Sequence, residues 1–274
     1  MKINKMSHFT YILTPYKPIR EIRNDDFTSY QVLLECSKED YLNLPSFNQK
    51  IIDKVGFNNT IYGIQKNIDS NDIELEYYFY THSQIWNNNF SNSWNTFRNS
   101  LDEYLDDNLK IDDIPVKFDI GMFSIDIPKS NEKISDLDIY DMKRGGGFCY
   151  RLNKNGFFNK NQYSFFYNPD DLEKGLAQRN IPSGCLIFGN RSIWFESVCI
   201  SLKKNKYWSI YYSMVKIDTL ILFLKRLNYP INIINYFTKN KDKLDHLLFD
   251  LGYDFNLSQG GFMDILRGGF YGYF

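Results

Sequence analysis

The sequence is short of residues on which several common classes of protein depend. Of its 274 residues only one, Ala177, is alanine, and only three are histidine. Alanine is the strongest helix former, so its scarcity works against an all-helical protein. Three dispersed histidines do not indicate a histidine-rich metal site. The four cysteines include no CxxC pair, which excludes the usual zinc clusters and small disulfide scaffolds.

Long apolar runs and an excess of either charge are also absent. Lys and Arg number 32 and Asp and Glu 33, so nothing draws the chain toward nucleic acid or an anionic bilayer. A membrane-spanning helix needs about 20 mostly apolar residues, and no such run exists. The first residues lack the apolar segment of a signal peptide. We therefore expect a soluble, cytoplasmic protein with reduced thiols, no membrane span and no nucleic-acid partner.

Aromatic residues are abundant instead. The chain has 23 Phe, 21 Tyr and 4 Trp, or 18% of its residues. Aromatic side chains favour strands, so this composition predicts a sheet-rich fold. AT-rich codons favour Phe and Tyr and explain part of the excess. The tyrosines need a further explanation, because a buried hydroxyl requires a hydrogen-bond partner.

Strand-like segments recur in pairs along the chain, separated by turn residues. We predict strands at 60–67 and 73–81, 116–127 and 137–142, 147–152 and 162–167, 193–202 and 207–214, and 247–255 and 265–274. An additional strand is predicted at Ser29–Cys36. Helical spacing of apolar residues predicts helices at 47–54, 92–105 and 218–227, and a further helix begins after Asn168. No linker-like composition divides the chain, so we expect a single domain over 1–274.

The predicted strands present two different faces. In 73–81, alternation places Leu75 and Tyr77 on one side, and Glu76 and Tyr78 on the other. The second face is polar yet aromatic, and Tyr140 and Tyr271 fall on the same kind of face. These tyrosines are either ordinary rim residues or the lining of an enclosed space. If about ten such strands close into a barrel, the lumen is lined by phenol rings and scattered charges.

Four stretches of the chain are similar to stretches of one known family: KPIREIRNDDF (17–27), FSIDIPKSNEKISDLDIY (123–140), RSIWFESVCISLKKNKYWSIYYSM (191–214) and the closing GGFYGYF (268–274). The family that they resemble is the ABBA-type prenyltransferases of cyanobactin (ribosomal cyclic peptide) pathways. The resemblance implies an α/β fold: a single barrel of ααββ repeats, with about ten antiparallel strands and an outer ring of helices.

The same resemblance implies an activity. In this family an isoprenyl group, C5 or C10, passes from its diphosphate to a side chain of a ribosomal peptide or to an aromatic acceptor. Basic residues neutralise the diphosphate, and tyrosines shield the allyl cation that forms when diphosphate leaves. Mg²⁺ is a possible cofactor accompanying the diphosphate. The expected partners are an isoprenyl diphosphate and a peptide or aromatic acceptor.

Residue assignments follow from the resemblance and from strand position. The expected diphosphate contacts are Lys66, Lys117, Lys143 and Arg267, and the expected cation shield is Tyr78, Tyr140, Tyr167, Tyr212 and Tyr271. Glu76 is the candidate base. The sequence departs from the family at three charged positions, where it has Tyr62, Glu76 and Asp138. No residue is assigned as a protein ligand of a metal.

Two alternatives remain open. The chain is either a transferase or a barrel that binds a ligand without catalysis, including an immunity-type binding protein. Residues 180–202 also loosely resemble the core of SMI1/KNR4-type domains, which include toxin-immunity proteins. That second likeness covers a small part of the chain and leaves the other strand pairs unexplained.

Overall fold

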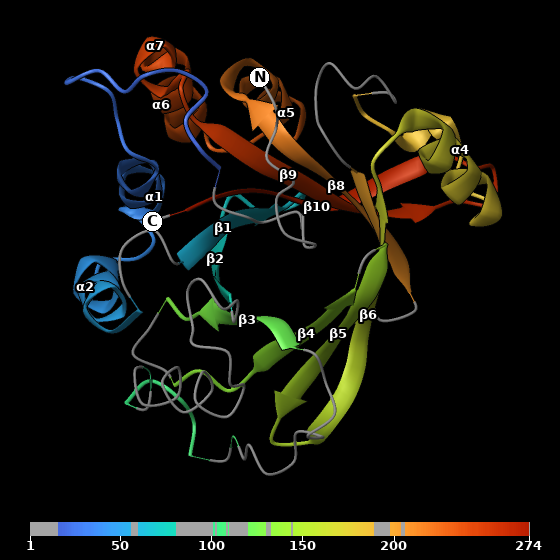
Figure 1. The fold of residues 1–274 in the computed structure, drawn as a ribbon, viewed down its shortest axis with the longest axis horizontal. Coiled ribbons are helices and arrows are strands. Elements are labelled where there is room, and N and C mark those ends of the chain that lie inside the picture. Colours follow the sequence, from blue (N-terminus) through green and yellow to red (C-terminus); the bar gives the residue numbers. More distant parts are fainter. Residues whose placement is uncertain are drawn as a thin grey trace, which may run out of the picture.

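The computed structural model describes residues 16–55, 60–80, 101, 103–107, 109, 120–129, 133–143, 145–188, 198–203 and 206–273. Within them, ten strands form one closed barrel in the order β1-β10-β9-β8-β7-β6-β5-β4-β3-β2, every neighbouring pair being antiparallel (Figure 1). The expected ABBA-type architecture, an antiparallel barrel with helices outside it, is therefore confirmed.

The strands agree closely with the predicted pairs. They are β1 (Thr60–Asn67), β2 (Ile73–Tyr80), β3 (Ile120–Ile127), β4 (Leu137–Lys143), β5 (Gly146–Asn153), β6 (Gly156–Phe166), β7 (Val198–Lys203), β8 (Tyr207–Lys216), β9 (Leu248–Leu257) and β10 (Met263–Tyr273). The predicted beginnings at 116–119 and 193–197 lie outside the described residues. β7 is an interior strand of the barrel between β6 and β8, so residues 198–202 do not form the core of a separate SMI1/KNR4-type fold.

Helices lie on the outside of the barrel (Figure 1). Those in the described residues are α1 (Ser29–Ser37), α2 (Leu44–Val55), α4 (Pro169–Gln178), α5 (Ile217–Arg226), α6 (Ile231–Lys239) and α7 (Lys241–Leu244), with a short 3₁₀ helix at Ser183–Cys185. The predicted helices at 47–54, at 218–227 and after Asn168 correspond to α2, α5 and α4. Most of the predicted helix at 92–105 lies outside the described residues.

The strand predicted at Ser29–Cys36 is wrong, because this segment is helix α1. Thr28 caps the helix: its side chain accepts a hydrogen bond from the backbone N–H of Gln31, while the Gln31 side chain accepts one from the backbone of Thr28. This reciprocal capping box satisfies two backbone donors and favours a helix start. The buried Val32, Leu33 and Cys36 then form the helical face that packs on the barrel.

The main hydrophobic core lies between the outer face of the barrel and the helices. Tyr62 and Tyr77 from adjacent strands pack there, together with Phe223 of α5 and Phe249 of β9, and all four are fully buried. The strand residues facing outward are therefore the apolar set. The opposite, inward set forms a second cluster that includes Tyr78, Tyr140, Tyr211 and Tyr271. The enclosed interpretation of the tyrosine-bearing face is confirmed.

Two of these inward tyrosines lie flat against glycines on neighbouring strands. A Cβ added at Gly252 would lie 2.4 Å from Cδ1 of Tyr211, and one added at Gly63 would lie 2.6 Å from Cε1 of Tyr271. Glycine at these positions lets each ring contact the backbone of the wall. The two glycines therefore set how far Tyr211 and Tyr271 project into the lumen.

We expect Gly252→Ala to destabilise the fold by about 1–3 kcal/mol, because the buried ring of Tyr211 must move away from the added methyl group. Urea unfolding of the purified variant measures the change. Gly184→Ala is the matched control, since a Cβ there meets no atom within 4 Å. Equal stability of the two variants would show that Tyr211 adjusts without strain.

Candidate active site in the barrel lumen

The lumen has a polar end and an aromatic middle. We call the polar end the hairpin end: it is where the first strand of each of the pairs β1–β2, β3–β4, β5–β6, β7–β8 and β9–β10 ends and the second begins. The inward charged residues lie close to these turns, as shown by Glu74 near the start of β2, Lys203 at the end of β7 and Arg267 near the start of β10. The inward tyrosines lie farther along the same strands.

Five tyrosines form a nearly continuous belt in the lumen. We call Tyr78, Tyr140, Tyr163, Tyr211 and Tyr271 the tyrosine belt. Successive ring centroids are 6.0 Å apart for Tyr163–Tyr140, 6.3 Å for Tyr140–Tyr78, 5.9 Å for Tyr78–Tyr271 and 6.2 Å for Tyr271–Tyr211. Burial raises the pKa of all five phenols well above the usual value. The belt is therefore neutral at physiological pH and presents ring faces and hydroxyl groups to the lumen.

Glu76 lies at the boundary between the belt and the hairpin end. Its carboxylate accepts hydrogen bonds from the Gln65 amide at 2.6 Å, the Tyr78 hydroxyl at 2.6 Å and the Ser124 hydroxyl at 2.8 Å. Glu76 is 9% exposed. Three neutral donors thus hold this carboxylate in a fixed orientation, and no described residue forms an ion pair with it.

Asp138 carries a deeply buried charge of the lumen. Its side chain is 2% exposed and accepts two hydrogen bonds from Arg151, at 2.7 and 2.9 Å, and one from Lys160. Although burial alone would raise it, the pKa of Asp138 is lowered by these two cations. Burial likewise opposes the charge of Lys160, but the carboxylate of Asp138 raises its pKa. The group is therefore fully ionised near neutral pH.

Two further cations among the described lumen residues, Lys203 and Arg267, are also paired. Lys203 lies 3.0 Å from Asp254 and 5.3 Å from the ring centre of Tyr211, and Asp254 accepts a further hydrogen bond from Ser209 at 2.5 Å. Arg267 pairs with Glu74. Arg267 and Glu74 are 28% and 46% exposed although their strand positions face inward. Solvent therefore reaches the lumen from the hairpin end.

Asp126 of β3 lies in this opening, with 56% of its side chain exposed. It is directly opposite Glu76 in the β2–β3 register, and its nearest cation is Arg151 at 3.3 Å. Enclosure by the barrel wall raises the pKa of Asp126 to about 6, and the charge of Glu76 adds to the effect. Like charges directly opposite each other on a sheet are destabilising.

Asp126→Asn is expected to stabilise the protein by about 1 kcal/mol at pH 7.5. The carboxyl binds its proton more tightly in the folded than in the unfolded state, so stability falls as the pH rises from about 4 to about 6. A shift of this size corresponds to about 3 kcal/mol, which solvent screening of a half-exposed group reduces. Urea unfolding at pH 7.5 and pH 4 measures both values. A gain at pH 4 as large as that at pH 7.5 would contradict this origin.

Several predicted residues meet in the lumen. Glu76, Tyr78, Tyr140 and Tyr271 lie together, and Arg267 is near them at the hairpin end. The predicted Lys117 and the side chain of the predicted Lys143 lie outside the described residues. Their assignment to the diphosphate stays a prediction.

Three other predicted residues are placed elsewhere. Lys66 lies opposite Ile73 and Gly268 on the outward face of β1, where its ammonium group donates to the carbonyl oxygens of Asn67 and Ile68. Tyr212 also faces outward and packs in the helix-side core, with its ring 5.2 Å from that of Phe188. Strand alternation therefore excludes both residues from the lumen. Tyr167 follows the end of β6 and is 46% exposed.

Sequence reasoning missed several lumen residues. Arg151, Lys160, Lys203, Tyr163 and Tyr211 were not assigned to the site. The predicted strand at 162–167 omitted the first half of β6, where Lys160 lies. A register shift between Cys149 and Tyr150 interrupts the alternation there. Lys203 lies one residue beyond the predicted strand at 193–202. Its place in the lumen follows from the β6–β7 register, in which it is opposite Asn161.

The carboxylates of the lumen do not form a ready-made metal site. Among the described residues, the one group of three potential ligands within reach of each other is Asp26, Asp245 and His246. Arg20 already bonds to both of these aspartates, at 2.6 Å in the case of Asp26. Mg²⁺ usually takes one or two protein carboxylates and fills its shell with phosphate oxygens and water. It therefore stays a proposal as a companion of the diphosphate.

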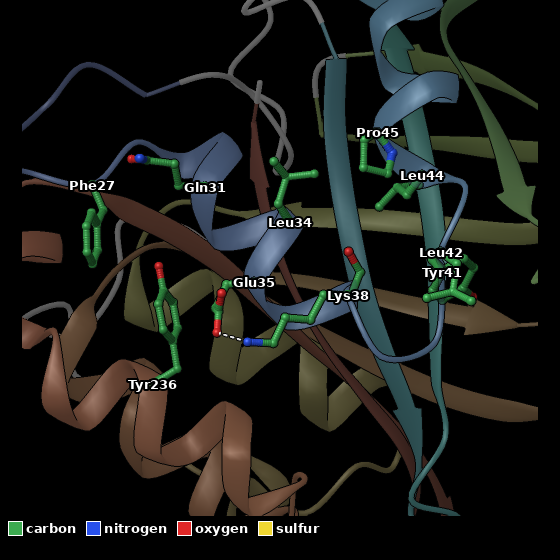
Figure 2. Close-up of a pocket in the computed structure, with 11 residues that line it drawn as sticks. Phe27, Gln31, Leu34, Glu35, Lys38, Tyr41, Leu42, Leu44, Pro45 and Tyr236 are labelled. Carbon is green, nitrogen blue, oxygen red and sulfur yellow. Dashed lines mark hydrogen bonds and ion pairs between the residues drawn. The ribbon is translucent and has the colours of Figure 1, made fainter.

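A separate hollow lies on the outer surface, between α1, the turn after it and α6 (Figure 2). This cavity of about 460 Å³ is lined mainly by apolar side chains, among them Phe27, Leu34, Leu42 and Tyr236. Glu35 and Lys38, which also line it, pair with each other (Figure 2). The hollow is on the helix side of the structure and does not contain the lumen residues.

Comparison with known proteins gives a match of fold. No family model matches the sequence, and no curated protein matches it. Among solved structures 22 chains match. One is described as "Crystal structure of NotF prenyltransferase", with 9% sequence identity, coverage of 77% of this chain and 80% of that chain, and a TM-score of 0.44. Among the described residues, no helix is long and apolar enough to cross a membrane.

Proposed function

We propose that the barrel transfers an isoprenyl group from its diphosphate to an acceptor bound in the lumen. The observation that carries this proposal is the buried tyrosine belt, which borders one fixed carboxylate, Glu76, and four cations at the hairpin end. The ribosomal peptide acceptor and the C5 or C10 donor belong to the same proposal, and they follow from the family resemblance of the sequence.

The tyrosine belt suits a reaction that passes through a carbocation. The negative ring faces of neutral phenols stabilise a nearby cation, and their stabilisation grows when water is excluded. Tyr78, Tyr140 and Tyr271 are each 4% exposed. Water at the reacting carbon would convert the cation to an alcohol, so this enclosure protects the transfer.

The diphosphate would bind at the cations of the hairpin end. Lys203 and Arg267 come from β7 and β10, and Lys160 from β6 is on the strand next to Lys203. Each is paired with a carboxylate, so the donor must compete with Asp254, Glu74 and Asp138 for them. Mg²⁺ bound with the diphosphate would reduce the repulsion between the donor and these carboxylates. Lys117 and Lys143 are further proposed contacts.

Mass spectrometry of the products tests the proposal directly. The protein is incubated with dimethylallyl or geranyl diphosphate, with and without Mg²⁺, and with a panel of peptides that contain different nucleophilic side chains. We expect one acceptor to gain the mass of the isoprenyl group. In parallel calorimetry, Lys203→Ala and Arg267→Ala should weaken donor binding, whereas Lys174→Ala on the exposed face of α4 should not. Absence of both product and donor binding would refute the transferase.

A barrel that binds a ligand without catalysis is the second candidate. Its support is that every lumen cation in the described residues already has a carboxylate partner, which opposes the binding of a multiply charged anion. Donor calorimetry separates the two candidates. A transferase must bind the diphosphate, whereas a barrel selective for uncharged or cationic ligands will not.

A further inference from the structure

The carboxylates of Glu76 and Asp126 form an inward-facing pair whose one ion-pair contact among the described residues is Arg151, a cation that Asp138 holds more closely. They are direct neighbours across β2 and β3. Arg267 pairs with Glu74, Lys203 with Asp254, and Arg151 and Lys160 with Asp138. This leaves Glu76 without an ion pair among the described residues. Asp126 has only Arg151 at 3.3 Å, and that guanidinium is already held by two shorter bonds to Asp138.

The position of the pair points to a ligand. Two opposed carboxylates cost stability, and a fold that retains them at the entrance to its lumen gains from a further cation beside the Arg151 that the described residues supply. Asp126 is 56% exposed at the hairpin end, while Glu76 is 9% exposed and hydrogen-bonded to Tyr78 of the tyrosine belt. A cation bound between them would therefore have one side toward solvent and the other toward the belt.

We propose that Glu76 and Asp126 bind a guanidinium group of the acceptor, such as an arginine side chain of a peptide. This inference extends the proposed function and depends on it for the reaction that the bound guanidinium undergoes. The planar guanidinium has five N–H donors and can bond to both carboxylates at once. Its flat faces also stack favourably on aromatic rings, which Tyr78 and Tyr271 offer beside Glu76.

A bound metal ion explains the pair less well. In the described residues, no third Asp, Glu, His or Cys joins Glu76 and Asp126 in a compact ligand group. A carboxylate has about four acceptor sites, and three neutral side chains occupy three of those on Glu76, which leaves one for a further hydrogen-bond donor. A lysine ammonium group would form fewer hydrogen bonds to the two carboxylates than a guanidinium, because it lacks the planar arrangement of N–H donors.

The proposed transfer then has a defined proton balance. The C–O bond of the donor breaks, and its electron pair leaves with the diphosphate. A guanidinium nitrogen forms the new bond to the allylic carbon and loses one proton. That proton passes to the carboxylate pair that binds the guanidinium, and the pair releases it to solvent through the exposed Asp126. No oxidant or reductant is needed.

Calorimetry without any donor tests the binding step alone. The full chain is titrated with N-acetyl-arginine methylamide and, in separate experiments, with the lysine analogue, the uncharged citrulline analogue and MgCl₂. We expect the arginine probe to bind at least ten-fold more tightly than either analogue. Glu76→Gln and Asp126→Asn should each weaken it at least ten-fold. Asp242→Asn, which removes an exposed carboxylate on α7, should leave it unchanged.

The results of these titrations and of the prenylation assay distinguish the guanidinium site from the transferase activity. Equal binding of the arginine and citrulline probes would overturn the guanidinium site, as would tighter binding of the lysine probe or of Mg²⁺ at this pair. If peptides lacking arginine become prenylated at full rate while the arginine probe does not bind, the inference fails and the transferase stands. If the arginine probe binds but no donor yields product, the guanidinium site stands and the transferase fails. Asp126→Asn is expected to fold, because its side chain is half exposed.

Discussion

Asp138→Ala should destabilise the barrel by about 3–5 kcal/mol, enough to abolish much of the stability of a typical domain. The carboxylate is 2% exposed and is the main partner of both Arg151 and Lys160, which are each 15% exposed. Its loss leaves two largely buried cations facing each other. Urea unfolding followed by circular dichroism measures the change.

Asp136→Asn is the matched control for this prediction. Asp136 is nearby but 32% exposed, and its contact with Arg151 is long, at 3.5 Å. We expect this control to lose no more than about 1 kcal/mol, as is usual for exposed ion pairs. If the two variants lose similar amounts, Asp138 is not the residue that neutralises the cations. Asp138→Asn should be intermediate, since an amide keeps a hydrogen-bond acceptor but removes the charge.

The barrel could be predicted because its signal is local and repeated. Alternation in Ile73–Tyr80 already separates Leu75 and Tyr77 from Glu76 and Tyr78, and the structure places these sets on the helix side and on the lumen side. The same rule placed Tyr140 and Tyr271 correctly. A period of two is a property of any strand with one apolar face, so the prediction needed no knowledge of which strands pair.

The predictions for Lys66 and for Ser29–Cys36 were wrong because they did not use information from neighbouring residues. Lys66 is an isolated basic residue in a strand, and its outward direction follows from the alternation it shares with Tyr62 and Ile64. Its assignment to the diphosphate came from the family resemblance and did not take that alternation into account. Ser29–Cys36 was predicted as a strand although it has one β-branched residue, Val32, and one aromatic residue, Tyr30; the capping box of Thr28 and Gln31 favours a helix.

The charges of the lumen were the least predictable feature. Arg151 and Lys160 belong to β5 and β6, and their common partner Asp138 belongs to β4. Such a cluster exists only after three strands have taken their registers, including the irregularity between Cys149 and Tyr150. From the sequence, each of these residues is indistinguishable from an exposed charge. The excess of carboxylates around Glu76 becomes visible only when the pairs have been assigned.

Glu76→Gln is expected to lower the rate of isoprenyl transfer by about 10²–10⁴-fold, the usual loss when a positioned base is removed. The substitution keeps the size of the side chain and one oxygen acceptor for Tyr78, Gln65 or Ser124, so the barrel should remain folded. Single-turnover formation of the prenylated acceptor, measured by mass spectrometry with saturating donor, reports the rate of the chemical step.

The variant Ser124→Ala and the donor affinity of Glu76→Gln show which step of the reaction depends on the Glu76 carboxylate. Ser124→Ala removes one hydrogen bond to Glu76 but leaves the carboxylate, so its loss should be about ten-fold or less. Donor binding by Glu76→Gln should equal or exceed that of the natural protein, because removing a negative charge beside Lys160 and Arg267 favours an anion. A variant that binds the donor normally but transfers slowly identifies Glu76 with the acceptor side of the reaction. Full transfer activity in Glu76→Gln would instead mean that its carboxylate serves only to hold Tyr78, Gln65 and Ser124 in place.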